Sequence, residues 1–141
     1  MNVEVNYLAV LVAGVAAMAV GFLWYGQMMF GKSWMRLMGY TKESMEKAKK
    51  EMGKTYAMSF VFTLVMAYVL THVMAMSQNF FGYGDMMTGL SSGFWMWLGF
   101  VMPVQATDVL FGGKKWKLFG INTGYQLVSL LVMGVVLGMM K

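Results

Sequence analysis

The chain has 141 residues, of which 59% are apolar and only 12% are charged, so its composition favours a membrane protein over a water-soluble domain. This length allows a single domain over residues 1–141. Cysteine is absent, which excludes disulfides and thiol nucleophiles. The formal net charge of +5 does not indicate nucleic acid, because the lysines gather beside long uncharged runs. That placement favours the anionic lipid of a cytoplasmic leaflet.

The first membrane span is predicted over about residues 5–29, which is long enough to cross a bilayer. Small residues recur along one ridge of this span at every fourth position, namely Ala9, Ala13, Ala17 and Gly21. Such a ridge lets another helix approach closely, either within the chain or from a second subunit. The aromatic pair Trp24 and Tyr25 precedes Lys32 and Arg36, and this order predicts an exit on the cytoplasmic side.

The segment from Gly26 to Ser33 matches the spacing of a phosphate-binding loop, G-x-x-x-x-G-K-[ST]. That loop binds phosphate only where it joins a buried strand to a helix. Here the segment follows a membrane span, and no strand pattern precedes it. We therefore expect no nucleotide binding despite the match.

The connection between Gly31 and Lys54 is basic and amphipathic, and it predicts a short helix that lies on the membrane surface. Thr41 is the expected N-cap. Two pairs at the favoured i,i+4 spacing follow it, Glu43 with Lys47 and Glu46 with Lys50. One face of the predicted helix carries Met45, Ala48 and Met52.

The three remaining spans are predicted over about residues 56–76, 86–111 and 118–140. Pro103 cannot donate a hydrogen bond to the carbonyl of Gly99, so a kink is expected in the third span. Pairs of glycines four residues apart predict close helix contacts, and these are Gly89 with Gly93, Gly120 with Gly124, and Gly134 with Gly138. The fold class is thus an all-α membrane protein, a bundle of four transmembrane helices with a short amphipathic cytoplasmic helix.

Lysine and arginine concentrate in the first and third connections, whereas the second connection has neither. Four spans place the first and third connections on the same side. The positive-inside rule then puts both basic connections in the cytoplasm and both termini on the outer side of the cytoplasmic membrane.

Polar residues from all four spans pool in the cytoplasmic half, namely Gln27, Ser59, Thr63, Gln105, Asp108, Asn122, Tyr125 and Gln126. Polar groups that face lipid without a partner are costly, so we expect these side chains to face inward. They form either a hydrogen-bond network or a water-filled vestibule that binds a small solute or ion. Asp108, the only acid within the spans, is expected either to pair with Lys114 or Lys115, or to act on a proton or cation.

At the other end of the spans, His72 is the only histidine and is expected to pair with Glu4 or with Tyr7. Methionines surround it in sequence, but methionine occurs throughout the chain, so no metal site is predicted. The sequence also contains no nucleophile–base pair or paired carboxylates, and we predict neither catalysis nor a cofactor.

Three motifs resemble a known family. They are Leu23-Trp24-Tyr25, then Phe30-Gly31-Lys32-x-Trp34-Met35, and then Leu118 with Asn122-x-Gly124-Tyr125-x-Leu127-Val128-Ser129. The chain is similar in these motifs to the uncharacterised bacterial integral membrane proteins filed as domain of unknown function 1761. The resemblance implies a small four-span protein without an assigned activity.

Two hypotheses of function follow. The first is a homo-oligomeric membrane protein that binds or passes a small solute or ion through the cytoplasmic polar cluster. The many small-residue ridges motivate the oligomer. The second is a scaffold or accessory subunit with a dry, satisfied core and no transport.

Overall fold

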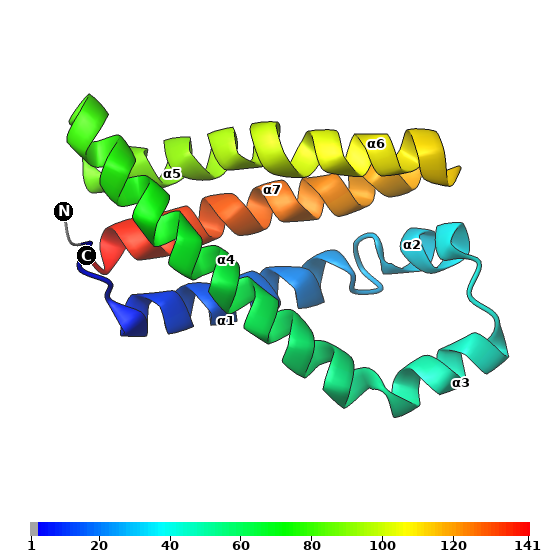
Figure 1. Ribbon diagram of the computed structural model, residues 1–141. Coiled ribbons are helices and arrows are strands. Elements are labelled where there is room, and N and C mark those ends of the chain that lie inside the picture. The colour runs from blue at the N-terminus through cyan, green and yellow to red at the C-terminus, as the bar shows by residue number, and fades with distance from the viewer. Residues whose placement is uncertain (1–2) are drawn as a thin grey trace.

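The computed structural model describes residues 3–141, and the regular elements within them are all helices (Figure 1). The elements are α1 (Tyr7–Trp24), α2 (Gly31–Met38), α3 (Lys42–Lys50), α4 (Met52–Phe81), α5 (Asp85–Met96), the π-helical turn η1 (Trp97–Val101), α6 (Met102–Gly112) and α7 (Trp116–Met139). Four helical stretches are long and apolar enough to cross a membrane: α1, α4, the continuous run of α5, η1 and α6, and α7. The predicted all-helical class with four helices of span length is therefore confirmed.

Two span boundaries differ from the prediction. The first helix ends at Trp24 rather than near residue 29, because the chain folds back there and the amide of Phe30 donates to the carbonyl of Trp24 at 3.0 Å. The second helix is longer than predicted and continues to Phe81, because no helix breaker interrupts it. It ends at Gly82, whose φ of 68° is a left-handed conformation that glycine adopts without steric cost.

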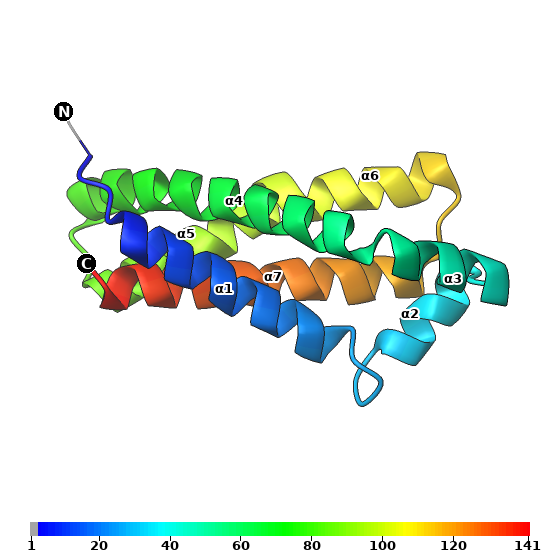
Figure 2. The same cartoon turned by 90° about the horizontal axis from the view of Figure 1, so that it is seen from below.

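The centre of the structure is α7, which packs against α5 on one side and α1 on the other (Figures 1 and 2). The contact with α5 is a direct approach of backbones. A Cβ on Gly89 would collide with the carbonyl of Gly134, and one on Gly138 would lie 2.7 Å from the carbonyl oxygen of Asp85. Glycine is required at these positions, so two of the predicted glycine pairs do mark helix contacts.

The small-residue ridge of α1 is used inside the chain. Ala9, Ala13 and Ala17 are all buried within the single chain, and Gly21 lies against the ring of Tyr125. The alternative of packing within one chain is thus confirmed for these residues. Because the ridge is already covered, it no longer motivates a homo-oligomer.

The expected irregularity near Pro103 takes the form of the π-helical turn η1, which lies directly before the proline. Proline lacks an N–H, so the carbonyl four residues earlier loses its normal partner. A wider π turn absorbs this loss while the helix continues through α5 and α6. The π turn also lies where the third span meets α7 beside the polar residues described below.

The connection after α1 contains two short helices, α2 and α3, where the sequence predicts one. Gly39, with φ 72°, ends α2. Thr41 caps α3 as predicted, and its hydroxyl accepts from the amide of Ser44 at 3.2 Å. The predicted i,i+4 ion pairs of α3 are absent from the described residues, because these exposed side chains remain solvated.

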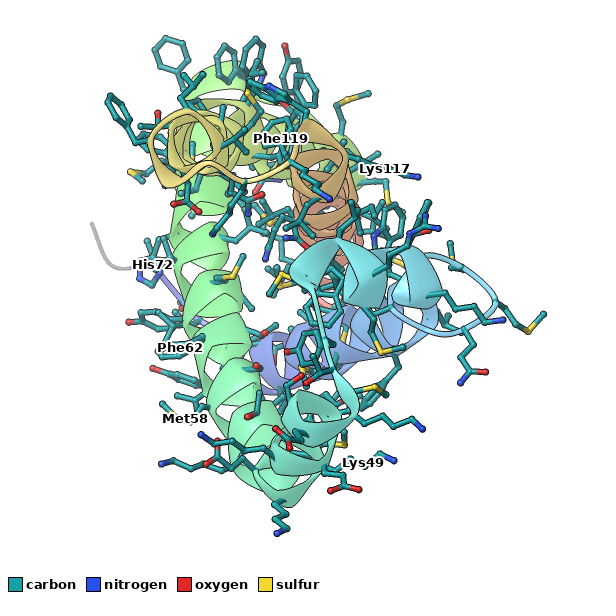
Figure 3. All side chains as sticks on the ribbon, turned by 90° about the vertical axis from the view of Figure 1, so that its right-hand side faces the viewer. Lys49, Met58, Phe62, His72, Lys117 and Phe119 are labelled. Atoms are coloured by element: carbon teal, nitrogen blue, oxygen red, sulfur yellow. The ribbon has the colours of Figure 1, made fainter. Side chains whose placement is uncertain are left out.

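The molecule has one basic end. The start of α1, the end of α7 and the turn between α4 and α5 lie at one end, whereas α2, α3 and the turn between α6 and α7 lie at the other (Figure 1). Figure 3 looks onto this second end, where Lys49 of α3 and Lys117 of α7 face the viewer. Ten of the eleven lysines and arginines belong to it, and the exception is Lys141.

The opposite end is fastened by polar contacts that the sequence did not suggest. Lys141 pairs with Asp85 at 3.2 Å, and the same carboxylate accepts from the amide of Gln78 at 2.6 Å. The side chain of Asn6 donates to the carbonyl of Met140 at 2.7 Å. The starts of α1 and α5 and the ends of α4 and α7 are thus tied together.

The contact between α5 and α7 predicts a clear difference between two glycine-to-alanine changes. Gly89→Ala should lower the free energy of unfolding by about 1–3 kcal/mol, because the new Cβ forces two backbones apart. Gly120→Ala is the matched control in α7, where nothing lies within 4 Å of the added Cβ. Thermal unfolding of the purified protein in detergent measures both. Equal melting temperatures for the two variants would contradict the close contact.

Candidate functional site

Two tryptophans position the half of α7 that lies toward the basic end. The indole N–H of Trp24 donates to the carbonyl of Ile121, and that of Trp97 donates to the carbonyl of Thr123, each at 2.9 Å. The ring of Trp24 also lies against Gly124, where a Cβ would be only 3.1 Å from it. These contacts hold one turn of α7 between α1 and η1. The side chains that follow on α7 are therefore fixed in direction.

A cleft of about 320 Å³ opens beside this turn, and we name it the entrance cleft. It is lined by Tyr25, Gln105, Asp108, Val109, Lys114, Leu118, Phe119, Asn122, Tyr125 and Gln126. The hydroxyl of Tyr25 donates to the side-chain oxygen of Asn122 at 2.7 Å. Asp108 pairs with Lys114, as one of the sequence alternatives predicted, and both side chains are more than half exposed. The charged groups of this cleft are therefore at its solvent-accessible rim.

A second cleft of about 240 Å³, here named the deep cleft, lies between α1, α4 and α7. It is lined by Ala17, Ser59, Phe62, Thr63, Met66, Tyr125, Gln126, Ser129 and Met133. Tyr125 and Gln126 line both clefts, so the two clefts lie next to each other at these residues. Tyr125 is held there by an edge-to-face contact with the ring of Tyr25, with a centroid distance of 5.2 Å.

A stripe of polar residues on α7, namely Asn122, Gln126 and Ser129, runs along the two clefts. Asn122 lines the entrance cleft, Gln126 lines both, and Ser129 lines the deep cleft. At about 1.5 Å per residue, Ser129 lies about 20 Å along the helix from Trp116. Met133, which is fully buried, follows it and begins the apolar core of the opposite half. The stripe therefore starts near the basic end and stops inside the protein.

Most residues of the predicted polar cluster line these clefts. Gln105, Asp108 and Asn122 lie in the entrance cleft, Ser59 and Thr63 in the deep cleft, and Tyr125 and Gln126 in both. Gln27 differs, because α1 ends before it and leaves its side chain exposed in a loop that lines neither cleft.

The predicted pair of Glu4 and His72 does not form in the described part of the chain. The His72 ring instead makes a 3.0 Å hydrogen bond with the carbonyl of Tyr68, one turn earlier in α4, and packs on the Tyr68 ring. His72 lies on the same flank of α4 as Met58 and Phe62 (Figure 3). Glu4 lines a separate small cavity near Lys141.

Sequence reasoning missed two residues of the site. Thr123 is buried, and its hydroxyl donates to the side-chain oxygen of Gln105 at 2.6 Å. No periodic signal marked it, because Thr123 is off the face that carries the α7 stripe. Ser129 was not placed in the polar cluster. Its spacing from Gln126 was the available signal.

The phosphate-loop match has a structural explanation. The amides of Met29 and Gly31 donate to the carbonyl of Gly26, at 3.1 and 3.0 Å. A Cβ on Gly31 would collide with the carbonyl of Tyr25. The glycines thus serve a tight turn whose amides point at its own carbonyls. A phosphate-binding loop needs such amides to face the ligand.

Comparison with known proteins gives a family and no activity. Neither a search of curated proteins nor a search of solved structures found a significant match. A family model does match, and it covers residues 8–138, which is nearly the whole chain. This agrees with the resemblance carried by the Trp-Tyr, Gly-Lys and Asn-x-Gly-Tyr motifs. The chain belongs to the family described as Protein of unknown function (DUF1761).

Proposed function

We propose that this chain is a small integral membrane protein that binds a small polar solute in a vestibule open to the cytoplasm. The proposed vestibule consists of the entrance cleft and the deep cleft, which share the lining residues Tyr125 and Gln126. The observation that carries the proposal is the polar stripe of α7, which lines this path from Asn122 to Ser129. Polar side chains inside a membrane span are costly unless they face partners or water, so a lined path implies something polar within it.

The location of the stripe favours binding over free passage. The hydrocarbon core of a bilayer is about 30 Å thick, and Ser129 is about 20 Å from the start of α7. Beyond it Met133, Leu137 and Met74 are buried and belong to one apolar cluster. A solute that enters from the basic end therefore reaches a closed floor. Its release on the far side would require the apolar half to rearrange.

The charge distribution supports a cytoplasmic entrance. The basic end carries the rim of the entrance cleft, including Lys114. Lysines and arginines are retained on the cytoplasmic side of membrane proteins. The same side chains favour contact with anionic lipid headgroups, which we propose as the lipid partner of α3.

The scaffold hypothesis keeps one supporting observation. Several polar groups of the cluster already have partners inside the protein. Asn122 accepts a hydrogen bond from Tyr25, and Gln105 accepts one from Thr123. Such bonds hold helices together at about 0.6 kcal/mol each. On this alternative, the clefts hold only water and the chain supports other membrane proteins.

The orientation is testable because the native chain has no cysteine. Single changes Lys47→Cys, Lys115→Cys and Tyr83→Cys place a unique thiol in each connection. A membrane-impermeant thiol reagent should label only the Tyr83 variant in intact cells, and only the two lysine variants in inverted vesicles. Labelling of the Lys47 and Lys115 variants from opposite faces would overturn the four-span arrangement.

Solute binding is testable by thermal unfolding of the purified protein with a panel of small polar solutes. Gln126→Leu should weaken the apparent Kd of any stabilising solute about tenfold, which corresponds to about 1.4 kcal/mol for a lost buried hydrogen bond. The matched control is Gln27→Leu, because Gln27 lines neither cleft. If the stabilisation survives in the Gln126 variant, or if no solute stabilises the native chain, the scaffold hypothesis is favoured instead.

A further inference from the structure

Ser129 presents a polar group that the protein does not satisfy. Its side chain is 2% exposed and lines the deep cleft, and its hydroxyl oxygen has no hydrogen-bond partner among the described residues. Serine and threonine in helices commonly bond back to the preceding turn. Thr63, on the opposite wall, does this by donating to the carbonyl of Ser59 at 2.8 Å. The Ser129 hydroxyl therefore lacks a partner at the wall of the deep cleft, and leaving it unpaired is unfavourable.

The rest of the lining of the deep cleft contains both polar and apolar side chains. The Gln126 amide makes no hydrogen bond with other described residues, and the Thr63 oxygen can still accept one. The same two helices also contribute apolar side chains to the lining, namely Phe62 and Met66 from α4 and Met133 from α7. A molecule that fits both parts has a hydrogen-bonding head and a short apolar portion.

Charge separates the two clefts. Among the described residues that line the deep cleft, none is charged. The ion pair of Asp108 and Lys114 belongs to the entrance cleft and neutralises itself there. An ion that moved into the deep cleft would lose its water and gain no opposite charge, which is strongly unfavourable.

We propose that the deep cleft selects a small uncharged solute, of the class of short-chain amides and alcohols, whose polar head bonds to Ser129 and Gln126. This inference rests on the proposed function, because it names the ligand class of the same vestibule. It goes further by excluding simple ions as the ligand of the inner part.

Cysteine accessibility tests the proposal without knowledge of the natural solute. Ser129→Cys introduces the only thiol of the chain into the deep cleft. The probes are three methanethiosulfonates with similar side groups: neutral hydroxyethyl, cationic aminoethyl and anionic sulfonatoethyl. Each is applied to inverted membrane vesicles, and each rate is divided by the rate of the exposed Gln27→Cys variant. We expect the neutral reagent to react at least about tenfold faster than either charged reagent at Ser129→Cys, because a charge must be desolvated to enter.

Two further positions keep the result interpretable. Ser92→Cys is the matched control, because the Ser92 hydroxyl is also buried and unpartnered in the described structure but lines neither cleft. It should resist all three reagents. Ser59→Cys, on the α4 wall of the deep cleft, repeats the test if the Ser129 variant fails to fold.

The outcomes separate the two proposals. Equal or faster reaction with a charged reagent would overturn the uncharged-solute inference and leave the vestibule intact. Failure of every reagent at both Ser129→Cys and Ser59→Cys, while Gln27→Cys reacts, would overturn the vestibule as well. Reaction at Ser92→Cys as fast as at Ser129→Cys would show loosened packing rather than a cleft, and would also count against the inference.

Discussion

The close backbone contact between α5 and α7 sets the position of the other groups in the structure. Gly89 and Gly134 face each other without side chains between them, and this fixes the register of the two antiparallel helices. From that register, Trp97 reaches the carbonyl of Thr123, and the Thr123 hydroxyl reaches Gln105. In lipid there is little hydrophobic drive between helices, so close packing and hydrogen bonds must supply the association.

The same constraint explains why the polar residues collect on α7. This helix has neighbours on both sides, and it is the one long helix whose side chains can find partners in α1, α4 and α6 at once. Asn122 meets Tyr25 at the end of α1, whereas Gln126 and Ser129 face cavities. Asn122 therefore helps to hold the helices together, whereas Gln126 and Ser129 line the cleft that we propose binds a solute. The structural role and the proposed binding role are thus divided along a single helix face.

Much of this arrangement could be predicted from the sequence, and the remainder could not for identifiable reasons. Glycine spacing predicted the contacts of Gly89 and Gly134, and the cost of polar groups that face lipid predicted that Asn122 and Gln126 belong to one polar cluster. The early end of α1 was missed, because the run of apolar residues after Trp24 continues the composition of the span. Only the turn formed by Gly26 and Gly31 reveals that the chain folds back.

Pairings between distant residues were the least predictable part. His72 bonds to the carbonyl of Tyr68 in its own helix, and this local contact takes the place of the expected pairing with Glu4 or Tyr7. The division of one predicted polar cluster into two clefts depends on the orientation of Tyr125, which sequence spacing does not specify. Lys141, the exception to the basic distribution, pairs with Asp85, which lies 56 residues earlier in the chain.

The polar contacts at the end opposite the basic end have a mechanical consequence. The ends of the long helices are joined there by the contacts of Lys141, Asp85, Gln78 and Asn6. The helix α4 runs obliquely across its neighbours from this end and departs from α6 toward α3 (Figures 1 and 3). Any widening between α4 and α7 would therefore be a rotation of α4 about the end that these contacts hold. The displacement would be largest at the opposite end, where α4 joins α3.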